Sequence, residues 1–378
     1  MKLIHLSDLH IGKRVNEFSM LEDQRHILKQ ILAIAEEQSP DGVLIAGDVY
    51  DKPVPPAEAV QVFDEFLTRL ADRGIPVCLV SGNHDSAERL AFGARLMSSR
   101  GVYVSPVYGG RTEKVCLRDA WGEVWIHLLP FLRPAAVRRA FPEEEIDSCE
   151  DGVRTAVAHM EVDTAARNVL VAHQFVTGAS LSESEELAVG GLDQVNGEIF
   201  KDFDYVALGH IHGAQRVGRE SMRYCGTPLK YSFAEAGQEK SVTVAELREK
   251  GNVSVKAIPL KPLRDMRKIR GTYMELTARD FYRNFNKEDY IHATLTDEED
   301  VVDGMRKLRA IYPNLMALEY DNRRTRESRE VTAAERIKEK SELELFEEFY
   351  ELQNNQPMSE VQREFAGRLI AALKDKEA

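Results

Sequence analysis

The chain has 378 residues, of which 43% are hydrophobic and 30% charged, and its formal net charge is -13 at pH 7. This length allows two compact domains and a tail. No apolar run approaches the roughly 20 residues that span a bilayer, which excludes a membrane-spanning protein. The first residues lead straight into an alternating strand, so we expect no signal peptide and a cytoplasmic location. The net negative charge argues against a continuous basic surface that binds nucleic acid. Any DNA binding would therefore be local, metal-assisted or shared with another subunit.

Strands and amphipathic helices alternate over about the first 100 residues, an order that predicts a parallel α/β sheet with right-handed crossovers. The strands expected there are 3–6, 43–46 and 77–80, and the helices are 21–38, 58–73 and 86–99. A β-hairpin at 114–129 and a helix at 153–167 are expected next. Further strands, which predict a second, mixed sheet, are expected at 169–172, 205–208, 223–225, 241–247 and 254–259.

Five short polar clusters follow apolar runs along the chain. Each lies within about three residues of the end of a predicted strand, where open α/β sheets gather their binding residues. Residues two apart in an extended segment point the same way, so D-x-H and H-x-H can each aim two side chains at one site. The clusters are Asp8-Leu9-His10, Gly47-Asp48, Gly82-Asn83-His84-Asp85, His173 and Gly209-His210-Ile211-His212.

Each cluster alone has an ordinary structural interpretation. An Asp-x-His at a strand end is more often a turn or cap than a metal ligand, a Gly-Asp is nearly always a turn, and a lone histidine is most often hydrogen-bonded and half-buried. The whole set, in order and in register with the strands, favours oxygen and nitrogen ligands for two divalent metals. A hydrolase of phosphate esters is the class of enzyme that such a pair indicates.

The clusters match the signature D-x-H, G-D-x-x-D, G-N-H-D, H and G-H-x-H, and through it the chain resembles the calcineurin-like metallophosphoesterases. Over about residues 1–320 it is similar to the double-strand-break repair nucleases of that superfamily. The resemblance implies a two-sheet metallophosphoesterase α/β sandwich with a small α/β cap domain and a C-terminal helical tail. The expected boundaries are 1–259 for the nuclease domain, 260–321 for the cap and 322–378 for the tail. The supporting stretches are His5–His10, Asp204–His210, Tyr224–Phe233 and Pro262–Arg267.

The resemblance also implies two divalent metals, with manganese as the expected ion. Two cations about 3.5 to 4 Å apart clamp the attacking and leaving oxygens of an in-line displacement. Mixed nitrogen and oxygen ligands suit Mn, Fe or Zn, so manganese rests on the resemblance alone. The implied ligands are Asp8, His10, Asp48 and His212 for one metal, and Asn83, His173, His210 and the shared Asp48 for the other.

His84 is not needed as a ligand in this scheme. We expect it over the scissile phosphate, as the general acid that protonates the leaving 3′-oxygen. Asp85 is expected either to orient His84 or to cap the helix that starts at Ser86. Two roles remain for Asp51: it either contacts the metal ligands or is an ordinary turn residue.

Three features bear on the substrate. Asp51 is followed by Lys52-Pro53 where phosphoprotein phosphatases carry Asp-Arg-Gly, which disfavours monoesters. No Gly-x4-Gly-Lys-Ser/Thr occurs, so any ATP dependence needs a partner. A basic linker at 261–270 is expected to lead into a cap, with strands at 274–276, 290–295 and 315–320 and a helix at 301–311. The alternative is a solvated linker followed by an unrelated module. The candidate DNA contacts are Arg264, Arg267, Lys268 and Arg270.

Beyond about Asn322 the chain is highly charged, and two apolar stripes at helical spacing predict amphipathic helices that dock another protein. The resemblance implies an ATPase subunit as that partner, and packing back on the cap is the alternative. Helices 58–73 and 86–99 match the family's dimer-forming helices, with Phe92 and Met97 as candidate contacts or ordinary core residues. The stripes are Leu343, Leu345, Phe346, Phe349 and Tyr350, and Val361, Phe365, Leu369, Ile370 and Leu373.

Together with these observations, the resemblance implies a manganese-dependent DNA nuclease subunit that acts with an ATPase, as a homodimer within a heterotetramer, in DNA end processing, recombination and repair. The expected activities are a 3′ to 5′ exonuclease on duplex ends and an endonuclease on single strands or hairpins. The alternatives are a small-molecule or cyclic-nucleotide phosphodiesterase of the same fold and a non-catalytic scaffold that tethers DNA ends.

Overall fold

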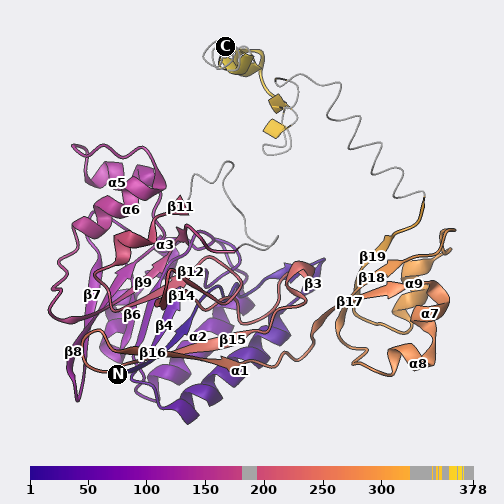
Figure 1. Ribbon diagram of the computed structural model, residues 1–378, viewed down its shortest axis with the longest axis horizontal. Coiled ribbons are helices and arrows are strands. Elements are labelled where there is room, and N and C mark those ends of the chain that lie inside the picture. Colours follow the sequence, from indigo (N-terminus) through magenta and orange to yellow (C-terminus); the bar gives the residue numbers. More distant parts are fainter. Residues whose placement is uncertain are drawn as a thin grey trace.

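The computed structural model describes residues 1–180 and 194–323 and, beyond them, residues 343, 346, 347, 349, 350, 357–363, 365–367 and 369. Two six-stranded sheets form the body of the protein, and a three-stranded sheet stands to one side of it (Figure 1). The predicted α/β sandwich is confirmed. No helix in the described part of the chain is long and apolar enough to cross a membrane.

The first sheet has the strand order β16-β15-β1-β4-β5-β6. Its strands are β1 (Lys2–Leu6), β4 (Gly42–Ala46), β5 (Val77–Val80), β6 (Val102–Val104), β15 (Ser241–Leu247) and β16 (Val253–Pro259). From β1 to β6 they run parallel, whereas β15 runs antiparallel to β1 and β16 antiparallel to β15. Helices α1 (Leu21–Gln38) and α2 (Ala57–Ala71) pack their apolar stripes, including Ile31 and Phe66, into the core on this sheet.

The second sheet has the order β13-β14-β12-β9-β8-β7 and is mixed, as predicted. Its strands are β7 (Glu113–Asp119), β8 (Gly122–Leu129), β9 (Arg167–His173), β12 (Tyr205–Gly209), β13 (Gln215–Val217) and β14 (Arg219–Tyr224). The expected hairpin is the antiparallel pair β7–β8. Helices α5 (Pro134–Ala140) and α6 (Cys149–Ala158) and the short η3 (Gly197–Phe200) contribute to the core on this sheet.

A largely apolar layer lies between the two sheets. Leu44 and Val80 of the first sheet and Val169 and Ala207 of the second have no exposed surface and belong to one buried cluster. The central strands are covered on both faces, which explains why they appear in the sequence as uninterrupted apolar runs. The buried His5 is a polar exception, and it hydrogen-bonds the Tyr205 hydroxyl and the Leu208 carbonyl of the second sheet at 3.0 and 3.2 Å. Buried polar groups without partners are costly, and the polar clusters that follow the strands gather at the edge of the layer.

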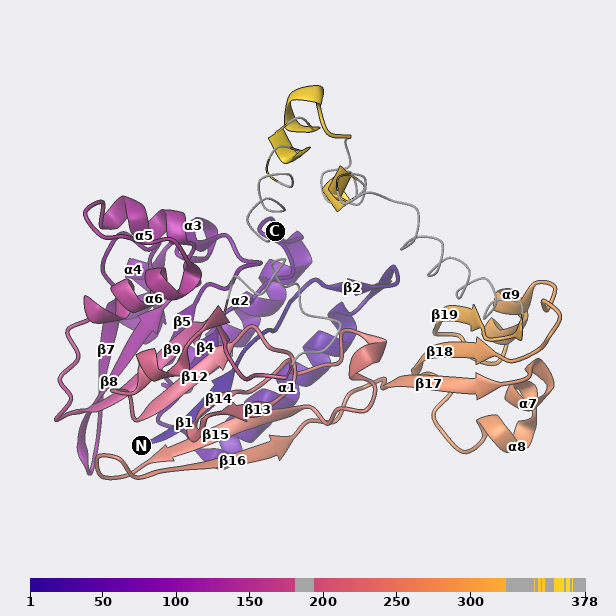
Figure 2. The same ribbon diagram turned by 45° about the horizontal axis from the view of Figure 1, so that its top comes forward.

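The third sheet is parallel and consists of β17 (Met266–Gly271), β18 (Tyr290–Leu295) and β19 (Leu315–Tyr320). Helices α7 (Tyr273–Thr277), α8 (Arg279–Tyr282) and α9 (Gly304–Arg309) belong to this unit, with a small core that includes Ile291 and Leu308 (Figure 2). Arg264 and Tyr290 fasten it to α1, because both hydrogen-bond the buried carboxylate of Asp23, at 2.8 and 2.7 Å.

Two predicted helices have different bounds. The helix expected at 86–99 is divided into α3 (Ala87–Leu90), α4 (Ala94–Met97) and η1 (Ser98–Arg100), because Gly93 takes a left-handed φ of 75°. The helix expected at 153–167 starts earlier and ends at Ala158. A capping box, in which the side chains of Ser148 and Asp151 bond each other's backbone N–H groups, starts it there.

Residues 241–271 and the cap differ from the prediction in three places. Strands β15 and β16 join the first sheet, beside β1, rather than the second. The predicted linker contains β17, and the predicted strand at 274–276 lies inside α7, because Thr272 and Glu275 form a helix-starting capping box. The remaining short elements are β2 (Arg14–Val15), β3 (Phe18–Ser19), β10 (Phe175–Val176), β11 (Gln194–Val195) and η4 (Phe233–Glu235).

Candidate metal centre

The predicted ligands converge at one edge of the sandwich, where five strands end. They come from both sheets. Asp8 and His10 follow β1, Asp48 follows β4, Asn83 follows β5, His173 ends β9, and His210 and His212 follow β12.

The backbone is strained at this edge. Asp8, His10, Asp48 and His210 all have positive φ angles, of 52°, 43°, 48° and 105°. Residues with a Cβ adopt such angles at a cost of about 1–3 kcal/mol each, and they persist only where the surroundings enforce them. Sharp turns at these positions direct several side chains back toward one point, which is the geometry that a metal centre requires.

Asp48 lies between two groups of donor atoms. In one group, ligand atoms of Asp8, His10 and His212 lie within 4.8 Å of one another, and His10 Nε2 is 3.3 Å from His212 Nε2. On the other side, Asp48 Oδ2 lies 3.4 Å from His173 Nε2. The same carboxylate oxygen is 3.7 Å from His10 Nε2, so one carboxylate reaches both groups.

Asn83 completes the second group. Its Oδ1 lies 2.9 Å from His173 Nε2 and 3.0 Å from His210 Nδ1. The structure therefore brings all seven predicted ligands together. Ligand atoms of Asp8, Asp48 and His173 also lie within 4.8 Å of one another, so the division of the ligands between two metals stays a prediction.

The donors around His173 fit a cation. The carbonyl of Ala46 can only accept, so His173 Nδ1 donates to it over 2.8 Å, and Nε2 is directed at two acceptor oxygens, those of Asn83 and Asp48. Burial lowers the pKa of His173, but the Asp48 carboxylate outweighs burial and raises it to about 9. His173 Nε2 is therefore the atom through which this ring would meet a cation.

Burial and neighbouring charges also shift the pKa values of the other ionisable groups in the centre. Burial raises the pKa of Asp8 to about 6, although His173 and His212 oppose the shift. Burial acts on Asp48 in the same sense, yet the charge of His173 and its hydrogen bond hold the pKa of Asp48 well below its usual range. Burial lowers the pKa of His210 to about 3, so its ring stays neutral and can offer a lone pair.

Glu235 is a functional residue that the sequence analysis missed. Its buried carboxylate accepts a hydrogen bond from His212 Nδ1 over 3.2 Å, which directs Nε2 toward His10, and it pairs with Lys240 at 2.6 Å. Carboxylates commonly fix the orientation and basicity of metal-binding histidines in this way. Glu235 stands 23 residues beyond His212, and nothing in its local sequence indicates the contact.

His84 lies at the rim of the centre, and its ring nitrogen is within 4.8 Å of ligand atoms of His10 and Asp48. Its Nδ1 donates to the Asp51 carbonyl over 3.1 Å, so Nε2 is the atom that can take up and release a proton. That Nε2 lies 4.0 Å from Asp48 Oδ2, and 23% of the side chain is exposed. The ring therefore faces both the centre and the solvent from which a substrate arrives.

Asp85 acts differently from both predicted roles. Its carboxylate accepts from the N–H groups of Val49, Tyr50 and Gly82, at 3.0 to 3.1 Å, and so ties the β4 loop to the β5 loop. The helix cap is Ser86, whose hydroxyl accepts from Arg89 N.

Asp51 contributes in two ways. Its backbone carbonyl orients His84, and its carboxylate pairs with Lys13 at 2.7 Å and lies 3.9 Å from His10 Nδ1. Of the two predicted roles for Asp51, these contacts favour a partner of the ligands.

The four basic candidates of the cap are mostly engaged by acids. Arg264 pairs with Glu22 and Asp23 and is 22% exposed, so the structure places it in the junction with α1. Arg267 pairs with Asp289 at 3.2 Å, and Arg270 pairs with Asp321. Lys268 is exposed on β17.

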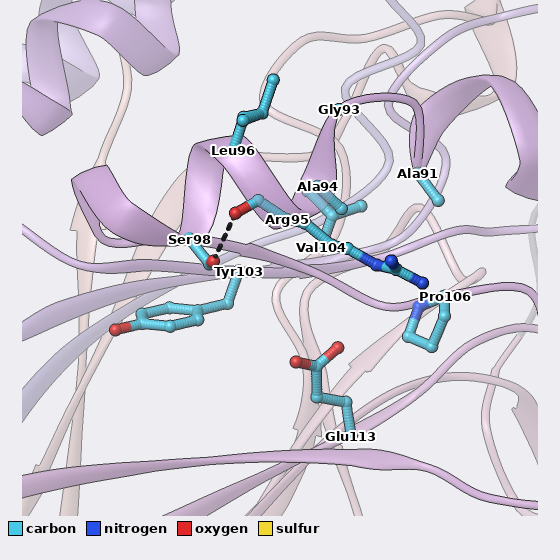
Figure 3. A pocket seen from close by; sticks show the side chains of 10 residues that line it. All are labelled: Ala91, Gly93, Ala94, Arg95, Leu96, Ser98, Tyr103, Val104, Pro106 and Glu113. Atoms are coloured by element: carbon cyan, nitrogen blue, oxygen red, sulfur yellow. Dashed lines mark hydrogen bonds between the residues drawn. The ribbon is translucent and has the colours of Figure 1, made fainter.

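A cavity of about 540 Å³ lies apart from this centre, over α4 and β6 (Figure 3). Arg95, Tyr103 and Glu113 are among its lining residues, and none of the seven predicted ligands is. It is therefore a surface hollow beside α4 rather than part of the metal centre.

Gly209 allows the two sheets to approach closely at the centre. A Cβ added there would lie 1.8 Å from the Ala46 carbonyl oxygen and 2.8 Å from His173 Nδ1, so the backbone or His173 must shift. We expect Gly209→Ala to destabilise the fold by about 1–3 kcal/mol and to weaken metal binding. Urea unfolding and calorimetric metal titration measure the two effects.

Gly213→Ala is the matched control for Gly209→Ala. The nearest atom to a Cβ at Gly213 is Gln238 Nε2 at 3.6 Å, an ordinary contact. Equal losses in the two variants would contradict the role assigned to Gly209.

Nitrogen and oxygen donors gathered at the meeting edges of two α/β sheets define a metallophosphoesterase, and comparison with known proteins agrees. A family model described as calcineurin-like phosphoesterase matches residues 1–214, and one described as type 5 capsule protein repressor C-terminal domain matches residues 262–354. The chain belongs to the calcineurin-like phosphoesterases and, within them, to the family of SbcD, a subunit of the nuclease SbcCD. The SbcD protein of Staphylococcus epidermidis is 32% identical over 384 residues, which cover 100% of both chains.

Two solved structures are more distantly similar. A dimetal phosphatase from Danio rerio is 12% identical, with a TM-score of 0.42, over 70% of this chain and 98% of that one. The protein TT1561 of Thermus thermophilus is 13% identical, with a TM-score of 0.39, over 68% of this chain and 98% of that one.

Proposed function

We propose that this chain is a manganese-dependent DNA nuclease that hydrolyses phosphodiester bonds with two metals. The observation that carries the proposal is the convergence of seven donor side chains, Asp48 at their middle, with His84 at the rim of the centre. The proposed activities are a 3′ to 5′ exonuclease on duplex ends and an endonuclease on single strands and hairpins. The proposed role is DNA end processing in recombination and repair, in the cytoplasm.

The chain's own residues have distinct tasks in this reaction. Asp8, His10, Asp48 and His212 would hold one metal, and Asn83, His173, His210 and Asp48 the other. Bound metals supply a hydroxide near neutral pH and polarise the phosphoryl oxygens. His84, with Nδ1 anchored on the Asp51 carbonyl, delivers a proton from Nε2 to the leaving 3′-oxygen. Glu235 and the Ala46 carbonyl hold His212 and His173 in the orientation that metal binding needs.

DNA is proposed over smaller diesters for two reasons. The full-length similarity to a protein named as a nuclease subunit supports it. We also propose that residues 260–321 form a cap that guides DNA, separate from the nuclease domain at 1–259 and the tail at 322–378. On this cap Lys268 is exposed on β17 and is the strongest candidate for phosphate contact. Arg264 is engaged at the junction with α1, and Arg270, although exposed, pairs with Asp321.

The decisive assay is digestion of end-labelled duplex and hairpin DNA with Mn²⁺, Mg²⁺, Zn²⁺ or EDTA. The proposal expects cleavage that requires a metal and is fastest with Mn²⁺. Hydrolysis of cyclic nucleotides without cleavage of DNA would instead support a small-molecule phosphodiesterase. A metal-loaded protein that binds DNA ends but cleaves nothing would support the scaffold.

We further propose that the tail binds the ATPase subunit SbcC. Leu345, Ile370 and Leu373 of the predicted stripes, and the charged stretch from Arg324 to Lys340, lie outside the described residues. Among the described residues of the tail, Arg363 and Glu347 form an ion pair, with Nε 2.5 Å from Oε1. The exposed apolar side chains are Phe346 (43%), Phe349 (40%), Val361 (75%), Phe365 (60%) and Leu369 (50%).

A chain truncated after Asn322 is expected to lose binding to SbcC while keeping hydrolysis of a small phosphodiester. The reason is that the truncation removes the exposed apolar residues and leaves the metal centre intact. In the full-length chain, the single substitution Phe365→Glu should also weaken binding to SbcC. Co-purification with SbcC measures both, and retention of the partner by the truncated chain would contradict the docking role.

A homodimer within a heterotetramer is proposed through the surface of α3 and α4. Phe92 and Leu96 are 86% and 79% exposed there, which is unusual for large apolar side chains. Met97, the second residue predicted for this contact, packs instead against the first-sheet core. Phe92 is therefore retained as a contact candidate, and Leu96 takes the place of Met97.

A further inference from the structure

A second cavity of about 540 Å³ opens directly beside the metal centre. Asn83 and His84 form one of its walls, and the segment from β8 into α5 forms the other. Phe131, Arg133 and Arg138 also line it. The proposed general acid thus stands between the metal ligands and an open space large enough for a substrate group.

The charge of this cavity is opposite to that of the chain. The lining residues include two arginines and no carboxylate, although the chain as a whole has a net charge of -13. Arg133 is exposed, and no hydrogen bond or ion pair engages its side chain in the part of the chain that the structure describes. The three arginines considered on the cap, by contrast, are all paired with acids. An unpaired guanidinium beside an acidic metal centre favours binding of a phosphate.

An aromatic ring borders the same space. Phe131 is half-buried, and its backbone N–H donates to the Ser81 carbonyl over 2.9 Å, which fixes it beside the β5 loop. Its ring stands edge-on to that of His173, with centroids 6.2 Å apart. Nucleic-acid sites of low sequence preference combine such rings, on which bases stack, with cations that contact the backbone.

We propose that this cavity seats the nucleotide whose 3′-oxygen leaves, with Arg133 on the phosphate at that nucleotide's 5′ side and Phe131 against its base. The inference rests on the proposed function, since it uses His84 as the donor to the leaving oxygen. His84 lines the cavity, so the group that it protonates must lie on this side of the scissile phosphate. Arg133 is then a specificity residue for a polynucleotide over a small diester.

The test compares two substrates with the full-length, metal-loaded protein: a single-stranded oligonucleotide and bis(p-nitrophenyl) phosphate, which has no nucleotide on the leaving side. We expect Arg133→Ala to raise KM for the oligonucleotide by about tenfold and to reduce the salt slope of binding by about 1, as for loss of one phosphate contact. Turnover of the small diester should not change. Arg133→Lys should restore part of the affinity, because it keeps the charge.

Arg139→Ala is the matched control, because Arg139 is an exposed arginine on α5, the helix that Arg133 precedes, and does not line the cavity. An unchanged KM for the oligonucleotide in Arg133→Ala would overturn the inference. Equal losses on both substrates would also overturn it, since they would indicate a disturbed centre. Wild-type protein that cleaves the small diester but no DNA would instead overturn the proposed function, and the inference with it.

Discussion

Asp48→Asn is expected to lower phosphodiester hydrolysis by at least about 10³-fold, because a Lewis-acid contribution of several kcal/mol depends on the metals that this carboxylate would bridge. Asp48 lies within reach of His10 on one side and His173 on the other. The amide keeps the shape of the side chain but removes the charge that both groups share. Metal content by mass spectrometry should fall together with activity.

Metal-dependent stability gives a second readout for Asp48→Asn. A ligand that binds only the folded state raises the unfolding temperature with its concentration, so Mn²⁺ should stabilise the wild type and have little effect on the variant. Asp64→Asn on α2 is the control, because that aspartate is exposed and belongs to none of the donor groups. If the variant keeps both metals and is still stabilised by Mn²⁺, the proposal that Asp48 would help to hold both metals is contradicted.

His84→Ala is expected to lower the turnover of DNA by about 10² to 10⁴-fold, the range typical of a lost general acid. Metal content and unfolding temperature should stay near those of the wild type, because His84 lies outside the two proposed ligand sets and its hydrogen bond is to a backbone carbonyl.

The leaving group separates acid catalysis from other roles of His84. A p-nitrophenolate leaves without a proton, so the variant should lose far less activity on a p-nitrophenyl diester than on DNA. Equal losses on the two substrates would assign His84 to binding or positioning rather than to proton transfer.

The sequence analysis located the strands that build the centre because each of them is buried on both faces. Strand β5 was predicted at its observed bounds, 77–80, and β12 to within one residue, at 205–208. Such runs of apolar residues end abruptly where the backbone reaches the polar edge, so the candidate ligands stood immediately after them. The proximity of Asp48 and His173 follows from the same pattern once the two sheets are stacked.

Contacts between distant segments left no comparable signal. Glu235 and the Ala46 carbonyl hydrogen-bond His212 and His173, and Arg133 lines the cavity beside them, but none of these three residues belongs to a sequence motif. Local hydrogen bonding also changed one assignment: Met274 lies in α7 because the capping box of Thr272 and Glu275 outweighs a short apolar pattern. Strand β15 pairs with β1, which lies far from it in the sequence. The alternation of apolar and polar residues within a strand indicates which face is buried but does not indicate the strand with which it pairs.

The pairing of β1 with β15 has a consequence for the order of events on the ribosome. Strand β1 is synthesised first, yet its neighbour on one side, Ser241–Leu247, emerges only after the whole second sheet has been made. Until then the nascent first sheet has an open edge that offers unpaired backbone groups to other chains. Closure of so long a loop is slow relative to local folding. A chain whose synthesis stops before Ser241 would therefore carry every proposed metal ligand and still lack the strand that protects its first sheet.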